Sequence, residues 1–167
     1  MAEGNLVQAT RQLPCSVAVL SAAAGGKQGA MTATAMYVSE TPPLIAVSVS
    51  RSFATYRLIE ESKEFAVNVI ADTQADLARQ FGREHGHDTD KFVELGIATE
   101  PGSRVGAPLV SGGFANMECR VKSALWDVEG NHAIYIAEVV AFKMNPDLRP
   151  TVWLNNRYFS VGPECRI

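Results

Sequence analysis

Apolar and polar residues alternate along much of this chain, and a pattern of period two predicts β-strands. The clearest run covers residues 29–35, where Thr32 and Thr34 fall on one face of an expected strand. The residues around them, Met31, Ala33 and Ala35, fall on the other face, because successive side chains of a strand point to opposite sides. One face of this strand is therefore expected to carry hydroxyl groups.

The next apolar run, residues 44–50, repeats this arrangement. Ser48 and Ser50 share one face, and the β-branched residues share the face expected to enter the core; these are Ile45, Val47 and Val49. Residues 40–43 predict a loop before this run, since their two prolines cannot donate a ladder hydrogen bond. Two hydroxyl-lined strands thus lead toward Arg51.

A helix is expected directly after this second strand. Ser52 is the predicted N-cap, and the helix should extend to about Ser62. A helix N-terminus offers unsatisfied N–H groups and positive partial charge, and Arg51 adds a planar cationic fork, so this point suits a phosphate group. We predict that Ser50, Arg51, Ser52 and Thr55 hold the phosphate of a cofactor. The alternative is an ordinary capped helix after an ordinary strand; the two hydroxyl-lined strands favour the phosphate site.

The rest of the chain has mostly the pattern of strands with short helices between them. Helices are expected from Asp72 or Thr73 to Phe81, ended by Gly82, and from Asp90 to near residue 96. Further strands are expected at residues 13–24, 64–70, 114–128 and 132–143, with a hairpin turn at 129–131 and two short strands about residues 155–156. About nine mostly consecutive strands and two or three short helices predict an antiparallel barrel with peripheral helices.

One of these strands, at residues 132–140, is apolar on both faces. Ala133, Tyr135 and Ala137 alternate with Ile134 and Ile136. A strand of this kind is expected to be covered on both sides, either within a barrel or by a contact between subunits.

Composition and charge narrow the class of protein. A chain of 167 residues with 47% apolar and 20% charged residues predicts one globular domain, which we assign to residues 13–167, after an arm or short helix at residues 1–12. The net charge of −3 and the lack of a basic run argue against nucleic acid as a partner. No run reaches the roughly 18 apolar residues of a membrane span, so no membrane association is expected.

The cysteines favour a reducing compartment. Cys15, Cys119 and Cys165 are odd in number, far apart and without CxxC spacing. This pattern fits reduced thiols better than a disulfide framework or a zinc site. Since the first residues also lack a signal-peptide pattern, a cytoplasmic location is expected.

Residues for acid–base or nucleophilic chemistry are sparse. His85 and His87 lie beside Asp88 in a polar segment, but without further ligands at defined spacing they do not indicate a metal site. No Ser or Cys motif accompanies a histidine, Glu60-Glu61 has the pattern of a solvated helix face, and no GxGxxG follows a strand. An enzyme whose cofactor performs the hydride and electron transfer needs none of these groups.

Short motifs follow one another from about Leu13 to about Val161. They are Met31-Thr32-Ala33-Thr34-Ala35, Pro42-Pro43-Leu44, Ser48-Val49-Ser50-Arg51-Ser52 with Thr55, and residues 64–69, 77–81, 90–92, 118–121, 132–139 and 150–158. In this order they resemble the flavin reductase-like proteins, which have an FMN-binding split barrel. Two positions depart from the family pattern: Thr34 stands where the family usually has Asn or Ser, and Asn131 stands where an Asp precedes the histidine.

The resemblance implies a mostly β fold, an antiparallel split β-barrel with two or three peripheral short helices, and a homodimer with flavin near the subunit interface. It also implies a flavin reductase in which NADH or NADPH reduces FMN, or FAD, and the reduced flavin serves a partner monooxygenase or stays bound. The alternative is a flavin-binding electron-transfer or sensor protein without reductase turnover, because no nicotinamide pocket can be identified in the sequence.

The resemblance and the strand pattern together give a set of expected flavin contacts. His132 is the candidate catalytic residue, expected to seat the nicotinamide or steady the geometry of hydride transfer. Phe81 is expected near the cofactor as a wall, and Arg157 and Tyr158 at its open side or across the dimer. The full set of expected flavin contacts is Thr32, Ala33, Thr34, Ala35, Ser48, Val49, Ser50, Arg51, Ser52, Thr55, Phe81, Arg157 and Tyr158. No metal is expected.

Overall fold

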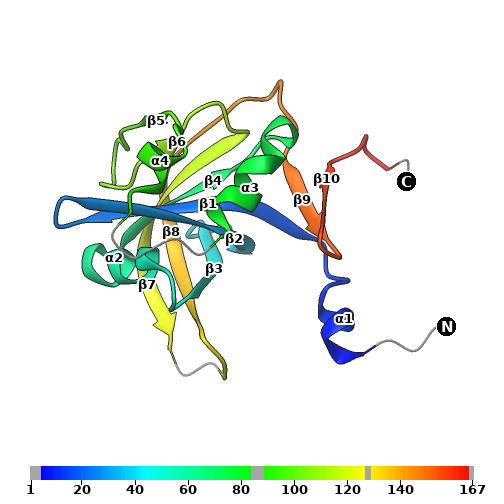
Figure 1. Ribbon diagram of the computed structural model, residues 1–167, viewed down its shortest axis with the longest axis horizontal. Coiled ribbons are helices and arrows are strands. Elements are labelled where there is room, and N and C mark those ends of the chain that lie inside the picture. Colours follow the sequence, from blue (N-terminus) through cyan, green and yellow to red (C-terminus); the bar gives the residue numbers. More distant parts are fainter. Residues whose placement is uncertain (1–4, 84–88, 127–128, 166–167) are drawn as a thin grey trace.

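The computed structural model describes residues 5–83, 89–126 and 129–165, which form ten strands and four short α-helices (Figure 1). The strands are β1 (Cys15–Ala24), β2 (Lys27–Ser39), β3 (Leu44–Ser50), β4 (Glu64–Val69), β5 (Thr99–Glu100), β6 (Leu109–Val110), β7 (Ala115–Leu125), β8 (His132–Met144), β9 (Thr151–Leu154) and β10 (Arg157–Ser160). The helices are α1 (Leu6–Thr10), α2 (Ala54–Ser62), α3 (Ala75–Phe81) and α4 (Lys91–Glu94), with a 3₁₀ turn, η1 (Asp72–Gln74), before α3.

Six strands close into a barrel. Their order is β1-β2-β3-β8-β7-β4, every pairing is antiparallel, and β1 completes the ring by pairing with β4. The β9–β10 hairpin extends the sheet beside the beginning of β1, where Cys15 lies opposite Trp153. The predicted antiparallel barrel is thus confirmed, with more helices than the two or three expected.

Strand β1 lies between two apolar layers, because its two faces serve different cores. Ala18, Leu20 and Ala22 enter the barrel interior. Val17 and Val19 point to the outside, where α3 and α4 cover them with a layer that includes Phe81. Helix α2 also packs on β1 and β2, so α2, α3 and α4 gather around this strand pair (Figure 1). None of the helices in the described ranges is long and apolar enough to cross a membrane.

Two predicted helix starts are wrong by a few residues. Ser52 does not cap α2: the N-cap is Phe53, whose N–H donates to the Ser50 carbonyl at 3.3 Å, so a turn delays the helix. The Ser52 hydroxyl instead lies 2.9 Å from that of Ser50. Likewise, the segment from Asp72 begins as a 3₁₀ turn, and α3 starts at Ala75. Gly82 does end α3 as predicted.

The hairpin at residues 155–156 is confirmed. Asn155 and Asn156 have φ values of 51° and 62°, a left-handed conformation that asparagine tolerates and that matches the twist of a two-residue hairpin. This turn sets β10 beside β9, with Tyr158 opposite Trp153.

Glu118 on β7 holds the loop at residues 101–107 against the barrel through hydrogen bonds. Its buried carboxylate accepts hydrogen bonds from the N–H groups of Ser103, Arg104 and Val105 at 2.6–3.0 Å, and from the Ser103 hydroxyl at 2.7 Å. Burial alone would raise the pKa of Glu118, but these hydrogen bonds outweigh it and hold the pKa below its ordinary value. The ionised carboxylate therefore contributes stability that is present above the pKa of the unfolded chain and is lost as pH falls through the folded pKa.

Glu118→Gln should lower the free energy of unfolding by about 2–3 kcal/mol at neutral pH, because buried N–H groups lose a charged acceptor. Denaturant titrations at pH 7 and in the acidic range would measure it, and the difference from wild type should shrink as the pH falls. Glu138→Gln is the matched control, since Glu138 pairs with Lys122 at the surface and such pairs contribute at most about 1 kcal/mol. A Glu118→Gln effect that does not depend on pH would contradict this account.

Candidate functional site

The barrel is open between β2 and β3 at one end. The two strands pair from Ala35 opposite Val47 to Ser39 opposite Leu44, whereas β2 continues toward Lys27 paired with β1. The segment with Thr32 and Thr34 therefore separates from the end of β3, which carries Ser48 and Ser50. The hydroxyl-lined faces predicted from the sequence lie on the two sides of this opening.

A cavity of about 280 Å³ lies at the opening. Six of the predicted site residues line it, namely Thr32, Ala33, Thr34, Ser48, His132 and Tyr158. Val17, Met31 and Trp153 complete its walls. The cavity thus combines apolar surface with hydroxyl groups and one imidazole, the mixture expected of a site for a planar heterocycle.

Thr32 has a defined orientation within this wall. Its hydroxyl donates to the Ala78 carbonyl of α3 at 2.6 Å, so its lone pairs remain as acceptors. Thr34 is exposed and Ser48 is half-buried, which leaves both hydroxyls beside the cavity space. These three groups can orient a ring edge by hydrogen bonds.

The predicted phosphate site lies at the end of β3. The Arg51 N–H donates to the Asn131 carbonyl at 2.9 Å, and Ser50 lies opposite His132 in the β3–β8 ladder, so this corner adjoins the cavity. Phe53 provides no side-chain cap for the first turn of α2 in the described structure. The first-turn N–H groups therefore suit an anion, and the exposed Arg51 is next to them.

A buried lysine braces this corner. Lys91 is 6% exposed, and its ammonium donates to the carbonyls of Phe81 at 3.0 Å and Arg83 at 2.9 Å. The same ammonium lies 4.9 Å from the centre of the Phe53 ring, within cation–π range. Burial lowers the pKa of Lys91. Lys91 thus ties the end of α3 to the start of α2.

Helix α2 is also held from the barrel side. The Tyr135 hydroxyl donates to Glu60 Oε1 at 2.7 Å, and burial, followed by this hydrogen bond to Glu60, raises the pKa of Tyr135. Glu60 is half-buried and bonded, so its interpretation as part of a solvated helix face is wrong; Glu61 is exposed. This contact holds the C-terminal half of α2 against the barrel, while Lys91 contacts Phe53 at the helix start on which the phosphate prediction depends.

Several predicted contacts lie away from the cavity walls. Val49 enters the barrel core, Thr55 is 1% exposed, and Phe81 is fully buried against Phe92 at a centroid distance of 5.4 Å. Ala35 is half-buried where β2 and β3 pair. Arg157 is exposed on β10, while its neighbour Tyr158 lines the cavity beneath the Arg79 guanidinium, 5.4 Å from the ring centre.

Val17, Met31 and Trp153 were not predicted to form the site. Trp153 reaches it because β9 pairs with the beginning of β1, a contact between residues far apart in sequence. His85 and His87 lie outside the described residues. Among the described residues, no group of three or more His, Cys, Asp or Glu could hold a metal ion.

The residues present fit both parts of FMN, the ring and the phosphate. Trp153, Tyr158 and Val17 offer a dry surface for a ring, Thr34 and Ser48 offer hydrogen bonds to its edge, and the α2 N-terminus with Arg51 offers an anion site. The cavity and the anion site both lie at the C-terminal end of β3.

Comparisons with known proteins agree with this arrangement. A family model described as a flavin reductase like domain matches residues 10–162. A flavin reductase (NADH) of Kitasatospora aureofaciens is 33% identical over 154 residues, which cover 90% of this chain and 77% of that protein.

Two solved structures share the fold. The NADH:FAD oxidoreductase SgcE6 of Streptomyces globisporus C-1027, in complex with NAD and FAD fragments, has a TM-score of 0.83 at 25% identity, with 96% of this chain and 93% of that chain covered. The styrene monooxygenase flavin reductase SMOB of Pseudomonas putida S12 has a TM-score of 0.81 at 25% identity, with 97% and 100% covered. The family prediction is confirmed: this chain belongs to the flavin reductase like family.

Proposed function

We propose that this protein is an NAD(P)H-dependent flavin reductase that reduces FMN or FAD and supplies reduced flavin to a partner monooxygenase. The observation that carries the proposal is the opening between β2 and β3, where a hydroxyl-lined cavity adjoins the N-terminus of α2. The relative named as a flavin reductase (NADH) and the reductase of styrene monooxygenase support the activity and the kind of partner.

Each wall of the site has a role in this reaction. When bound, the flavin supplies the redox chemistry by accepting a hydride from the nicotinamide. Arg51 and the first turn of α2 bind its phosphate, and Thr34 and Ser48 orient its ring. Trp153 and Tyr158 exclude water from one side, while the exposed His132 lies where a nicotinamide can be held against the ring.

The proposal is tested with the purified wild-type chain. We expect it to bind FMN and to oxidise NADH continuously when free flavin is supplied, measured by loss of the NADH absorbance. Binding of flavin without steady-state oxidation of NADH or NADPH would identify a flavin-binding electron-transfer or sensor protein instead. A protein that takes up no flavin and oxidises neither nucleotide would reject both.

We also propose a homodimer, because the outer face of the barrel beside the cavity is apolar. Met36, Ala46 and Ile136 form one row across β2, β3 and β8, and directly paired residues point to the same side. Met36 is 64% exposed in the single chain, and Ile136 is half-buried. In the next row, Leu125 lies opposite Ile134 and is 59% exposed. A second copy would cover these side chains.

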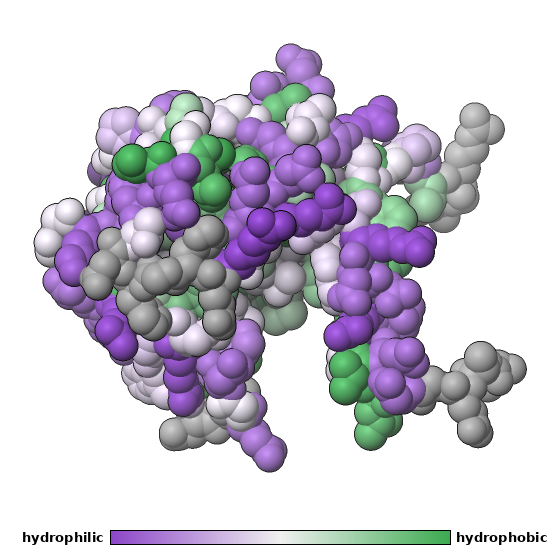
Figure 2. All heavy atoms as spheres, in the orientation of Figure 1, coloured by the Kyte–Doolittle hydropathy of each residue, from purple (hydrophilic) through white to green (hydrophobic). Residues whose placement is uncertain are grey.

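Helix α1 supports the same proposal. It extends away from the barrel, and hydrophobic side chains lie at its end (Figures 1 and 2). Leu6 is 86% and Val7 60% exposed, and no residue of α1 is buried within the described chain. A short arm with exposed apolar residues is suited to packing on a neighbouring subunit.

Sedimentation at micromolar concentration should therefore give a mass of about twice the 18.0 kDa of one chain. Met36→Glu should shift the protein toward monomer, because it introduces a charge into the covered face. Val93→Glu is the matched control, since Val93 is 76% exposed on α4 and outside this face. A wild-type mass of one chain would reject the dimer.

We also propose a cytoplasmic location for this flavin reductase. The three cysteines are free, and burial raises the pKa of the Cys119 thiol to about 12, so this residue has the character of an inert core side chain. Free thiols and a supply of NADH are both features of the cytoplasm.

A further inference from the structure

A buried tyrosine links helix α2 to strand β8. Tyr135 lies in the barrel interior and is fully buried, and its hydroxyl donates to Glu60 Oε1 of α2 at 2.7 Å. Tyr56, one helical turn before Glu60, has its ring centre 6.5 Å from that of Tyr135, with the two ring planes at 53°. Residues four apart share a face of a helix, so this face of α2 contacts Tyr135 by one polar and one aromatic interaction.

Glu60 also interacts with the end of the β7–β8 hairpin. Trp126 directly follows Leu125, the last residue of β7, which lies opposite Ile134 near the beginning of β8. Burial, the largest influence, would raise the pKa of Glu60, but hydrogen bonds outweigh it and lower the pKa; Tyr135 is the strongest of these donors and Trp126 the weakest. The ionised carboxylate therefore accepts from both strands of the hairpin.

The two elements that Glu60 connects carry the two halves of the proposed site. Helix α2 begins at Ala54, shortly after Arg51, where the flavin phosphate is expected to bind. Strand β8 begins at His132, three residues before Tyr135, and the nicotinamide is expected there. The geometry of hydride transfer therefore depends on how α2 lies relative to the beginning of β8.

The other contacts of α2 are mainly apolar. The helix packs on β1 and β2, and Leu58 and Ile59 are part of the barrel core. Apolar contacts are non-directional, whereas a hydrogen bond weakens when its angle changes. The bond between Tyr135 and Glu60 is thus suited to set the rotation of the helix against β8.

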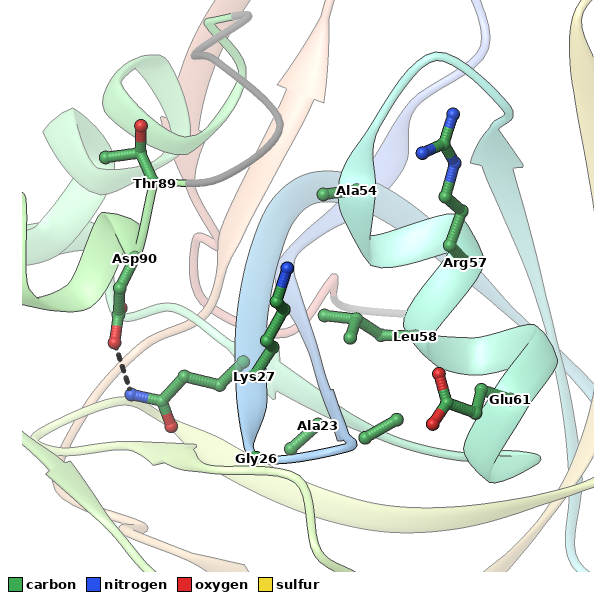
Figure 3. A pocket seen from close by; sticks show the side chains of 11 residues that line it. Ala23, Gly26, Lys27, Ala54, Arg57, Leu58, Glu61, Thr89 and Asp90 are labelled. Atoms are coloured by element: carbon green, nitrogen blue, oxygen red, sulfur yellow. Dashed lines mark hydrogen bonds between the residues drawn. The ribbon is translucent and has the colours of Figure 1, made fainter.

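The neighbouring carboxylate faces elsewhere. Glu61 is exposed and lies on the wall of a second cavity, between α2 and the β1–β2 hairpin (Figure 3). Consecutive residues of a helix are about 100° apart, so Glu61 and Glu60 project in different directions. Glu61 is therefore a matched control for Glu60.

We propose that Glu60 is a positioning residue for hydride transfer. By accepting hydrogen bonds from Tyr135 and Trp126, it holds α2 in the orientation in which a flavin bound by its phosphate at the helix start presents its ring to a nicotinamide at His132. Glu60 does not line the cavity, so it acts through His132 and the first turn of α2. This inference rests on the proposed function, since it assumes a flavin and a nicotinamide in that site.

Stopped-flow reduction of bound FMN at saturating NADH tests the proposal. Glu60→Ala should lower the rate by about fivefold or more, while the dissociation constant for FMN changes by less than about threefold. Glu60→Gln should restore the rate to within about twofold of wild type, because its amide oxygen still accepts from Tyr135. Tyr135→Phe, which removes only the donor, should lower the rate by about threefold. Glu61→Ala should keep the wild-type rate.

The same substitutions in a His132→Ala background separate positioning from a general loss of structure. There Glu60→Ala should lower the remaining rate by less than about twofold, because the geometry that Glu60 sets is no longer used. If Glu60→Ala does not fold, Tyr135→Phe takes its place in both backgrounds.

Two results would overturn the proposal. One is an equal loss of rate with and without His132, and the other is a wild-type rate in both Glu60→Ala and Tyr135→Phe. If the wild-type chain reduces FMN and these variants do so equally fast, the reductase proposal stands and only the role of Glu60 is rejected. A wild-type chain that reduces no flavin rejects both.

Discussion

Arg51→Ala should raise the dissociation constant for FMN by about one to two decades, because a charge-assisted contact with a phosphate contributes roughly 1.5–3 kcal/mol. The backbone N–H of Arg51 is hydrogen-bonded to the Asn131 carbonyl, so the Arg51 side chain starts from a fixed point next to the beginning of α2. The first turn of α2 has no side-chain cap at Phe53, so the anion site loses an exposed positive charge directly before the helix.

The comparison with riboflavin makes this test specific. Riboflavin lacks the phosphate, so its affinity should change little in Arg51→Ala, and the preference of the protein for FMN over riboflavin should fall with the FMN affinity. Arg149→Ala is a suitable control, since Arg149 is an exposed arginine outside both cavities. If Arg51→Ala keeps the wild-type preference for FMN, the phosphate is bound elsewhere.

The strands were predictable because the two faces of most of them meet different surroundings. Burial on one side imposes period two, and this is how β2 and β3 could be recognised, whereas β8 was recognised as a strand apolar on both faces and the β9–β10 hairpin by its Asn-Asn turn. The start of α2 was not, since Ser52 is an excellent cap by residue type, but its hydroxyl is next to Ser50 and the chain turns once more before the helix. A local contact between the Ser50 and Ser52 hydroxyls thus stands where the helix cap was expected.

The candidate site was predictable only along its own strands. Thr32, Thr34 and Ser48 could be placed on one face by alternation alone, and they do line the cavity. Alternation does not show which strands are neighbours. The contribution of Trp153, which depends on the β1–β9 pairing, therefore could not be predicted. Phe81 was included because of the resemblance to the family, although it is the last residue of α3 and is buried in the layer that α3 and α4 form over β1.

A second cavity, of about 810 Å³ between α2 and the β1–β2 hairpin, could not be predicted from the sequence. Its walls are a helix face and a hairpin turn, and each has an ordinary pattern for its own element: Leu58 and Ile59 on the buried side of α2, and paired glycines at the turn. The cavity lies between these elements. Cavities formed between elements in this way become visible only in three dimensions.

His132→Ala should lower the rate of flavin reduction by NADH by about tenfold or more, while the affinity for FMN changes by less than about threefold. His132 starts β8, is exposed, and shares the cavity with Thr34 and Ser48. Although it lies opposite Ser50, its removal leaves Arg51 and the start of α2 in place, so phosphate binding is preserved. The substitution removes the His132 imidazole, which we expect to hold the nicotinamide at the distance that hydride transfer requires.

Stopped-flow reduction of bound flavin, with titration of FMN in parallel, separates these two effects. Arg157→Ala is the comparison: Arg157 does not line the cavity, but the resemblance places it at the open side of the flavin or across the dimer. Its loss should then weaken flavin binding while leaving the reduction rate of the saturated protein nearly unchanged. A raised KM for NADH together with a lower rate would place His132 at the nicotinamide, as a positioning residue whose loss affects both. If His132→Ala reduces bound flavin at the wild-type rate, the imidazole serves only the beginning of β8, and the nicotinamide must be held by other walls of the cavity.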